Sequence, residues 1–203
     1  MALAEPEVEI RTASIHDVAR IATALGRAFH DDPVLSWAIP ESDRRRAVLP
    51  GFFTIFTGAF QRHGHVYRTA DGTGAALWVP PGVAPVGDDE AAAFGAALEE
   101  ICGPDAERAL AIGALLDENH PHEPVWYLNF MGVEPAGQGR GVGSALLEKV
   151  LVRADGDAAA AYLDATSMGN RRLYERHGFE ARGELVVPGG PPLWQMWREP
   201  RDR

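Results

Sequence analysis

The chain has 203 residues, of which 46% are hydrophobic, and this suffices to bury the core of one domain. Its net charge of −10 argues against nucleic-acid binding, and no apolar run reaches the roughly 18 residues that a membrane-spanning helix needs. The N-terminal residues lack the apolar core of a signal peptide, and a single cysteine, Cys102, excludes an internal disulfide. We therefore expect one cytoplasmic domain over residues 1–203, without a nucleic-acid or membrane partner.

The first third of the chain predicts a strand and two helices. Residues 8–13 (VEIRTA) favour a strand, and Ser14–Asp17 resembles a capping box at the start of a helix. Asp31–Pro33 should end that helix, because the residue before a proline avoids the helical region. A second helix over about residues 44–62 is expected to be interrupted at Pro50.

The middle of the chain predicts a hairpin followed by two helices. Residues 65–69 and 75–80 are rich in β-formers and flank an Asp-Gly turn, which favours a hairpin. Helices are expected at about residues 88–101 and 104–119. Cys102 continues the apolar pattern of the first of them, so we interpret it as a core residue rather than a nucleophile.

The second half of the chain alternates strands and helices. Residues 123–133 (EPVWYLNFMGV) form the clearest predicted strand, and their apolar character indicates burial on both faces. After a glycine-rich loop, residues 144–154 favour a helix, whereas residues 158–165 suit a helix by composition and a strand by position. A short helix over residues 170–177 and a hairpin over residues 180–199 complete an α/β domain.

The glycine-rich loop lies in residues 135–150 (PAGQGRGVGSALLEKV) and has glycine at every second position from Gly137 to Gly143. At a junction of strand, loop and helix, unpaired backbone N–H groups and the helix dipole favour an anion, and glycine lets a phosphate oxygen approach. The spacing fails the dinucleotide fingerprint, and a Walker loop is excluded because Lys149 is the sole lysine. The loop therefore predicts a phosphate site of another kind, with a merely flexible turn as the alternative.

Two motifs resemble a known family. Gln138–Gly143 matches the Gln-x-x-Gly-x-Gly signature of the GCN5-related N-acetyltransferases (GNATs), and residues 170–180 (NRRLYERHGFE) resemble the family's later Asn, Tyr and Gly-Phe motif. Stretches within residues 118–200 are also similar to the puromycin N-acetyltransferases and their relatives. The resemblance implies a single-domain GNAT fold, a mixed central sheet flanked by helices, with two strands splayed at the acyl-coenzyme A site. Residues 120–200 would bind acetyl-coenzyme A, and residues 40–119 would form variable acceptor-side helices and a hairpin.

The resemblance also implies roles for single residues. The strand around Gly132 would pair with the pantetheine arm of acetyl-coenzyme A, and the loop would hold its pyrophosphate. Tyr174 would be the catalytic residue, protonating the departing thiolate or donating a hydrogen bond to it. The coenzyme-binding residues implied in this way are Met131, Gly132, Val133, Gln138, Gly139, Arg140, Gly141, Val142, Gly143, Ser144 and Asn170.

Several of these residues have a structural alternative. Met131 and Val133 suit a core strand, and Asn170 could cap the helix that it begins. Tyr174 could be an ordinary amphipathic tyrosine, and Arg140 could face solvent instead of a phosphate.

The resemblance implies transfer of an acetyl group to a primary amine of a small molecule, by direct attack in a ternary complex. The general base is not evident, although Glu134 follows the predicted strand. Asp31 and Asp32 could bind a cationic amine or form a solvated turn. Trp37, together with Trp126 and Tyr127, could line an aromatic acceptor pocket or belong to the core.

Two alternatives to this function stay open: acetylation of a protein N-terminus or lysine, and a non-catalytic acetyl-coenzyme A sensor. A homodimer is a further possibility. The pairs His63/His65 and His120/His122 lack additional ligands at a recognised spacing, so we expect no metal site.

Overall fold

The computed structural model describes residues 8–201, whose strands form one mixed sheet in the order β1-β2-β3-β4-β5-β7-β6. Neighbouring strands are antiparallel except for β4 and β5, which are parallel. The strands are β1 (Ile10–Thr12), β2 (Val66–Thr69), β3 (Gly74–Val79), β4 (Trp126–Val133), β5 (Ala161–Ala165), β6 (Glu180–Val186) and β7 (Pro192–Arg198).

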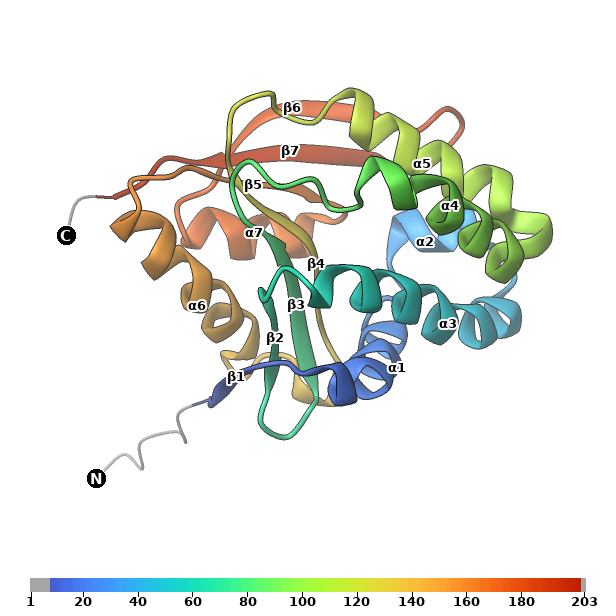
Figure 1. Ribbon diagram of the computed structural model, residues 1–203, viewed down its shortest axis with the longest axis horizontal. Coiled ribbons are helices and arrows are strands. Elements are labelled where there is room, and N and C mark those ends of the chain that lie inside the picture. The colour runs from blue at the N-terminus through green and yellow to red at the C-terminus, as the bar shows by residue number, and fades with distance from the viewer. Residues whose placement is uncertain (1–7, 202–203) are drawn as a thin grey trace.

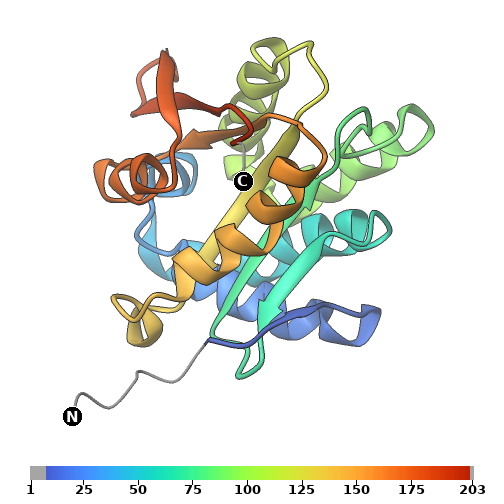
Figure 2. The same ribbon diagram turned by 90° about the vertical axis from the view of Figure 1, so that its left-hand side faces the viewer.

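Helices cover both faces of the sheet (Figure 1, Figure 2). Side chains of α1 to α5 belong to a hydrophobic cluster on one face, whereas those of α6 and α7 belong to a second cluster on the other. This is the α/β fold with a mixed sheet flanked by helices that the resemblance implied. The helices are α1 (Val18–Ala28), α2 (Pro33–Ala38), α3 (Ser42–Gln61), α4 (Asp88–Cys102), α5 (Ala106–Glu118), α6 (Val142–Gly156) and α7 (Met168–Arg176).

The parallel strands β4 and β5 separate halfway along β4. Their pairing covers only Trp126–Leu128 against Ala161–Leu163, although β4 continues to Val133. Beyond Leu128 the edge of β4 that faces β5 is therefore free of strand partners, while its other edge stays paired with β3 as far as Val133. The splayed strand pair that the resemblance implied is present.

The segment before α2 combines a correct prediction with an omission. The Asp17 carboxylate accepts a hydrogen bond from the Ser14 backbone N–H at 2.8 Å, as expected for the capping box before α1. The sequence predicted only a helix end at Asp31–Pro33, whereas Asp32 also caps the short helix α2, because its carboxylate accepts from the backbone N–H groups of Val34 and Leu35. Its neighbour Pro33 suits the first helical position, where no N–H is needed.

Helix α3 is continuous, so the interruption expected at Pro50 was wrong. Pro50 packs against Gly26 of α1, where an added Cβ would lie 3.2 Å from the Pro50 nitrogen. The close contact between α1 and α3 keeps this turn helical despite the cost that proline imposes inside a helix.

The other predicted elements are confirmed with small changes of their ends. The hairpin of β2 and β3 and the helices α4 and α5 are present, with a short 3-10 turn, Gly103–Asp105, between the two helices. Cys102 is fully buried, which confirms its place in the core. The ambiguous residues 158–165 contain the strand β5, as their position between two helices favoured. Among residues 8–201, no helix combines the length and apolar character needed to cross a bilayer.

Candidate active site

A cavity of about 640 Å³ lies at the point where β4 and β5 separate. On one side of the sheet its walls come from α3, α4 and α5, including Phe56 and Phe94. From the cluster on the other side, Tyr174 of α7 also reaches it, and so does Asn170 one turn earlier on the same helix. Residues from both sides of the sheet thus line this cavity.

Asp164 of β5 is one wall of this cavity, and the sequence analysis did not identify it as a site residue. The Tyr162 hydroxyl donates a hydrogen bond of 2.7 Å to Asp164 Oδ1 and accepts one of 3.1 Å from Gln195 Nε2. These contacts fix the carboxyl group at the splay. Burial raises the pKa of Asp164 to about 6, although the hydrogen bond from Tyr162 lowers it. The available signal was one acid in an otherwise apolar strand, AAAAYLDA.

Of the three predicted substrate residues, the structure brings only Asp32 to the cavity. The Asp32 carboxylate accepts hydrogen bonds from Val34 N at 2.9 Å, from Leu35 N at 3.0 Å and from the Thr166 hydroxyl. Burial raises its pKa despite these donors. Asp32 is therefore an enclosed carboxyl group rather than part of a solvated turn.

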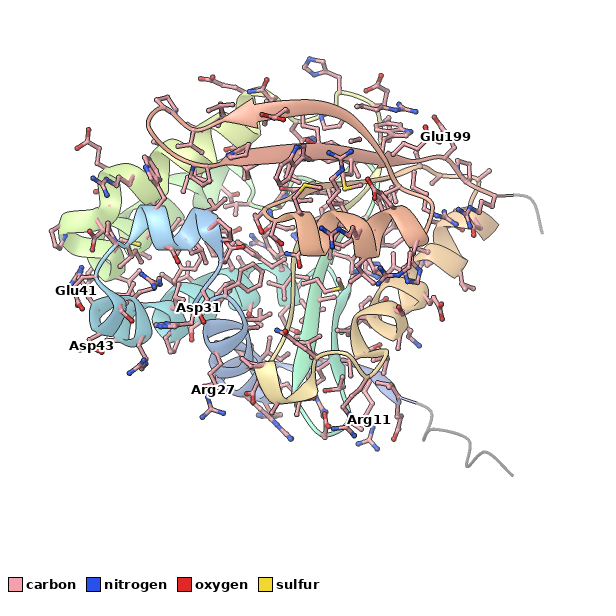
Figure 3. The ribbon with its side chains drawn as sticks, turned by 180° about the vertical axis from the view of Figure 1, so that it is seen from behind. Arg11, Arg27, Asp31, Glu41, Asp43 and Glu199 are labelled. Atoms are coloured by element: carbon pink, nitrogen blue, oxygen red, sulfur yellow. The ribbon has the colours of Figure 1, made fainter. Side chains whose placement is uncertain are left out.

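The other two predicted substrate residues lie elsewhere. The Asp31 side chain is 91% exposed and outside the cavity, beside His30 (Figure 3). Trp37 is not a cavity residue. Its indole Nε1 donates to the Gly189 carbonyl at 2.7 Å, and the Arg108 guanidinium lies over its ring. Neither position supports contact with an acceptor held in the cavity.

Tyr174 lines the cavity from α7. The residue is 6% exposed, and its ring packs against Phe179 with the ring centroids 5.9 Å apart. Burial, and then the negative charge of Asp32, raise the pKa of Tyr174, so its hydroxyl stays protonated at neutral pH. The residue can therefore donate a proton or a hydrogen bond.

Asn170 does not cap α7, so that alternative was wrong. The helix begins two residues earlier, and the Ser167 hydroxyl accepts from the Asn170 backbone N–H at 3.2 Å as its cap. The side chain of Asn170 is left to face the cavity, with its Nδ2 3.5 Å from Thr166 Oγ1.

The four glycines of the loop before α6 serve two purposes. Gly139 and Gly141 have φ angles of 75° and 76°, which side chains rarely adopt, and an added Cβ would point into open space. Gly137 and Gly143 instead allow close packing, since a Cβ would lie 3.1 Å from Val133 and 3.0 Å from Leu173. The loop is thus a shaped turn, and its shape leaves one side open.

Backbone N–H groups at the start of α6 are free to bind a ligand. The first helical hydrogen bond runs from Ala145 N to Gly141 O at 3.0 Å, and within residues 8–201 no acceptor faces the N–H groups of residues 139–144. The Gln138 side chain donates to Val133 O at 3.0 Å and ties the loop to β4. Ser144 Oγ lies 2.9 Å from His177 Nε2, and Arg140 is exposed. The arrangement suits an anion.

At the end of β4, some residues line the cavity and others serve close packing. Met131 lines the cavity, whereas Gly132 is required by packing, because a Cβ there would lie 2.8 Å from Ala28 and 3.0 Å from Phe29. Glu134 pairs with Arg27 of α1 at 3.2 Å and is not a cavity residue; the Arg27 side chain lies at the surface of the molecule (Figure 3). The structure therefore does not place Glu134 where a general base would act.

Of the predicted aromatic candidates, Tyr127 lines the cavity and Trp126 does not. The Tyr127 hydroxyl accepts from Asn129 Nδ2 at 3.1 Å, and Trp126 is 1% exposed in the core beneath α6. The sequence did not identify Asn129 or the phenylalanines of α3 and α4 as cavity residues.

The histidines make separate contacts. His63 Nε2 lies 3.1 Å from Pro85 O, His65 Nδ1 lies 3.0 Å from the Tyr67 hydroxyl, and His120 Nδ1 lies 2.9 Å from Pro121 O. In the part of the chain that the structure describes, no group of three or more His, Cys, Asp or Glu side chains could hold a metal ion.

Comparisons of the sequence with known proteins find acetyltransferases. A family model described as an acetyltransferase (GNAT) domain matches residues 96–181. An uncharacterised N-acetyltransferase of Schizosaccharomyces pombe is 26% identical over 202 residues, covering 91% of this chain and 80% of the relative.

Solved structures of proteins described as acetyltransferases have a similar fold. A Corynebacterium glutamicum protein described as histone acetyltransferase HPA2 and related acetyltransferase has a TM-score of 0.70 and 26% identity, over 97% of this chain and 98% of that chain. Arylalkylamine N-acetyltransferase 2 of Aedes aegypti has the same fold, with a TM-score of 0.58 and 16% identity, over 96% of this chain and 100% of that chain.

The matched family segment contains β4, the glycine loop, α6, β5 and α7, where both sequence motifs lie. The narrower resemblance to puromycin N-acetyltransferases stays a prediction.

Proposed function

We propose that the chain is a GNAT-family N-acetyltransferase and that it transfers the acetyl group of acetyl-coenzyme A to a primary amine of a small molecule, as the family match and the acetyltransferase relatives support. The observation that carries this proposal is the cavity at the splay of β4 and β5, which is lined by residues from both sides of the sheet. A donor and an acceptor can meet there from opposite sides without a covalent enzyme intermediate.

The donor would lie along the free edge of β4 and the start of α6. GNAT enzymes use acetyl-coenzyme A as a co-substrate, whose pyrophosphate is an anion. The unpaired N–H groups of residues 139–144 and the α6 dipole supply a matching site. The pantetheine arm would pair with β4 beyond Leu128, which directs the thioester toward Met131, Tyr174 and Asn170 in the cavity.

Asp164 is the best-placed general base. Within residues 8–201, only the Tyr162 hydroxyl donates to Asp164, so Oδ2 is available, whereas both oxygens of Asp32 already accept hydrogen bonds. A pKa of about 6 leaves Asp164 ionised at neutral pH and able to take a proton.

The reaction would proceed in two steps at the splay. The amine nitrogen attacks the thioester carbonyl carbon, its proton moves to Asp164, and a backbone N–H of β4 stabilises the oxyanion. Collapse of the tetrahedral intermediate breaks the carbon–sulfur bond. The coenzyme A thiolate then leaves with a proton or a hydrogen bond from the Tyr174 hydroxyl.

The shape of the cavity favours a small acceptor over a protein. Its walls of α3, α4 and α5 surround the space beyond β4, whereas a peptide would need an extended groove. The presence of both Asp164 and Tyr174 at the splay also favours a catalyst over a non-catalytic sensor of acetyl-coenzyme A.

A substrate panel tests the proposal directly. The purified protein is incubated with acetyl-coenzyme A and a set of small primary amines or basic peptides, while free thiol release and acetylated products are measured. We expect release that depends on small amines. Transfer to peptides alone would support the protein acetyltransferase, and tight binding of acetyl-coenzyme A without transfer to any amine would support the sensor.

A further inference from the structure

We propose that the acceptor is a lipophilic amine without an acidic group, and that the cavity excludes amines that carry a carboxylate. This inference rests on the proposed function and narrows its acceptor. It excludes free amino acids as substrates and selects amines whose bulk is an alkyl or aryl group.

The charges around the cavity support the exclusion of amines that carry a carboxylate. Three carboxyl groups, those of Asp32, Asp117 and Asp164, line it, and none of the cavity residues that the structure describes is a lysine or an arginine. Asp32 and Asp164 lie at the splay, whereas Asp117 is exposed on α5. An ammonium group would therefore meet carboxyl groups both on α5 and at the splay.

A carboxylate on the acceptor would meet the opposite situation. It would approach the same three acids with no lysine or arginine in the wall to pair with it, and it would lose its water in doing so. The ionisable base among the described cavity residues is His120, whose Nδ1 already lies 2.9 Å from the Pro121 carbonyl oxygen. A binding site that places an unpaired charge of a ligand next to like charges binds that ligand much more weakly than a ligand without the charge. The neutral polar groups of Asn129, Thr166 and Asn170 offer hydrogen bonds but no compensating charge.

The aromatic wall carries the second half. Phe130 of β4 and Phe52 and Phe56 of α3 line the cavity together with Phe94 of α4. The Phe56 ring meets two of the others edge to face: its centroid lies 4.9 Å from that of Phe130 and 5.0 Å from that of Phe94. This surface can bury an apolar body, at about fourfold in affinity for each methylene group removed from water.

Three probes with one carbon skeleton test the charge rule. 2-Phenylethylamine has no substituent beside the amine, phenylalaninol adds a neutral hydroxymethyl group, and phenylalanine adds a carboxylate. We expect kcat/KM for phenylalaninol to be within about tenfold of that for 2-phenylethylamine, and kcat/KM for phenylalanine to be at least about 100-fold lower. Phenylalaninol controls for the size of the substituent.

A matched pair of variants tests the aromatic wall. Phe56→Leu alters a ring that lines the cavity, whereas Phe53→Leu alters a fully buried ring of the same helix that does not. We expect Phe56→Leu to lower the ratio of kcat/KM for 2-phenylethylamine over ethylamine severalfold. Phe53→Leu should leave this ratio within about twofold of wild type, even where it lowers stability.

Specific results would overturn the inference. Phenylalanine as good as phenylalaninol would show that the acids do not select against a carboxylate. Ethylamine as good as 2-phenylethylamine, or a peptide with N-terminal phenylalanine better than both, would show that the aromatic wall does not hold the acceptor. Absence of transfer to every amine of the panel would instead contradict the proposed function.

Discussion

The loop before α6 and the cavity beyond β4 are neighbouring regions of opposite chemistry. The loop presents backbone N–H groups on glycines with positive φ, and its side chains, such as that of Arg140, are secondary. The cavity presents side chains, with carboxyl groups at the splay and aromatic rings on α3 and α4. One region suits a phosphate and the other suits an ammonium group with an apolar body.

This difference has a consequence for substitution. A backbone site depends on φ angles and on the absence of Cβ atoms, so it tolerates few changes and leaves a recognisable sequence motif. A side-chain site can change its acceptor through Phe56 or Phe94 without affecting the donor loop. Variants of the two regions should therefore separate the kinetics of the acceptor from the binding of the coenzyme.

The largest expected effect is that of Asp164→Asn on turnover. The asparagine keeps the volume and an oxygen to accept from Tyr162, but it cannot take a proton. We expect kcat to fall by about 10² to 10⁴, the range typical of general-base catalysis, while the Kd of acetyl-coenzyme A stays unchanged. Calorimetry and thiol-release kinetics measure the two quantities. A kcat within twofold of wild type would remove Asp164 from the mechanism.

Tyr174→Phe should have a smaller effect on the same step. The ring keeps its packing against Phe179, and only the hydroxyl group is lost. Because a thiol of pKa near 8.5 is a fair leaving group, we expect kcat to fall by about 10², the lower end of the range for general-acid help. Unchanged turnover with acetyl transfer shown to be rate-limiting would mean that the thiolate leaves unaided and that Tyr174 is structural.

Gly141→Val should act on coenzyme affinity rather than on turnover. Valine is strained at a φ of 76°, so the loop must change shape and turn its N–H groups away. We expect Kd for coenzyme A to rise by about tenfold, measured by calorimetry. Gly64→Val is the control, because Gly64 has a φ of 72° and equally open surroundings outside the loop. Equal losses of affinity in both variants would contradict a phosphate site at Gly141.

The sequence predicts the donor region better than the acceptor region for a physical reason. Glycine spacing, the strand before it and the helix after it are local signals within residues 123–154, and the structure confirms the three elements. The cavity instead depends on side chains that are far apart in the sequence. Phe56, Phe94, Asp164 and Tyr174 come from α3, α4, β5 and α7, and only the folded chain brings these elements to one cavity.

Adjacent residues show the same limit on a smaller scale. Asp31 and Asp32 are indistinguishable in the sequence, yet one is exposed and the other is enclosed. The cap of α2 decides the difference, because Asp32 turns inward to accept from Val34 and Leu35. Since α2 has only six residues, its periodicity was too short to be predicted.

The smallest expected effect is that of Tyr162→Phe, which should displace the dependence of kcat on pH. Asp164 must be ionised to accept a proton, so kcat at saturating amine should fall as the pH drops through about 6, the pKa of this carboxyl group. The Tyr162 hydroxyl stabilises the carboxylate by donating to it, and its removal should raise the pKa of Asp164 further. The acidic limb of the profile should therefore move to higher pH, with little change of kcat on the alkaline side.

The control for this displacement is Tyr67→Phe, which removes the hydroxyl of a buried tyrosine that does not line the cavity. Protonation of the amine affects wild type and both variants equally. A difference between the acidic limbs of their plots of kcat against pH therefore reports on a group of the enzyme. A limb that moves to lower pH in Tyr162→Phe, or moves equally in Tyr67→Phe, would show that Asp164 is not the group that titrates. The cavity would then supply charge to hold the acceptor, and the proton would leave by another route.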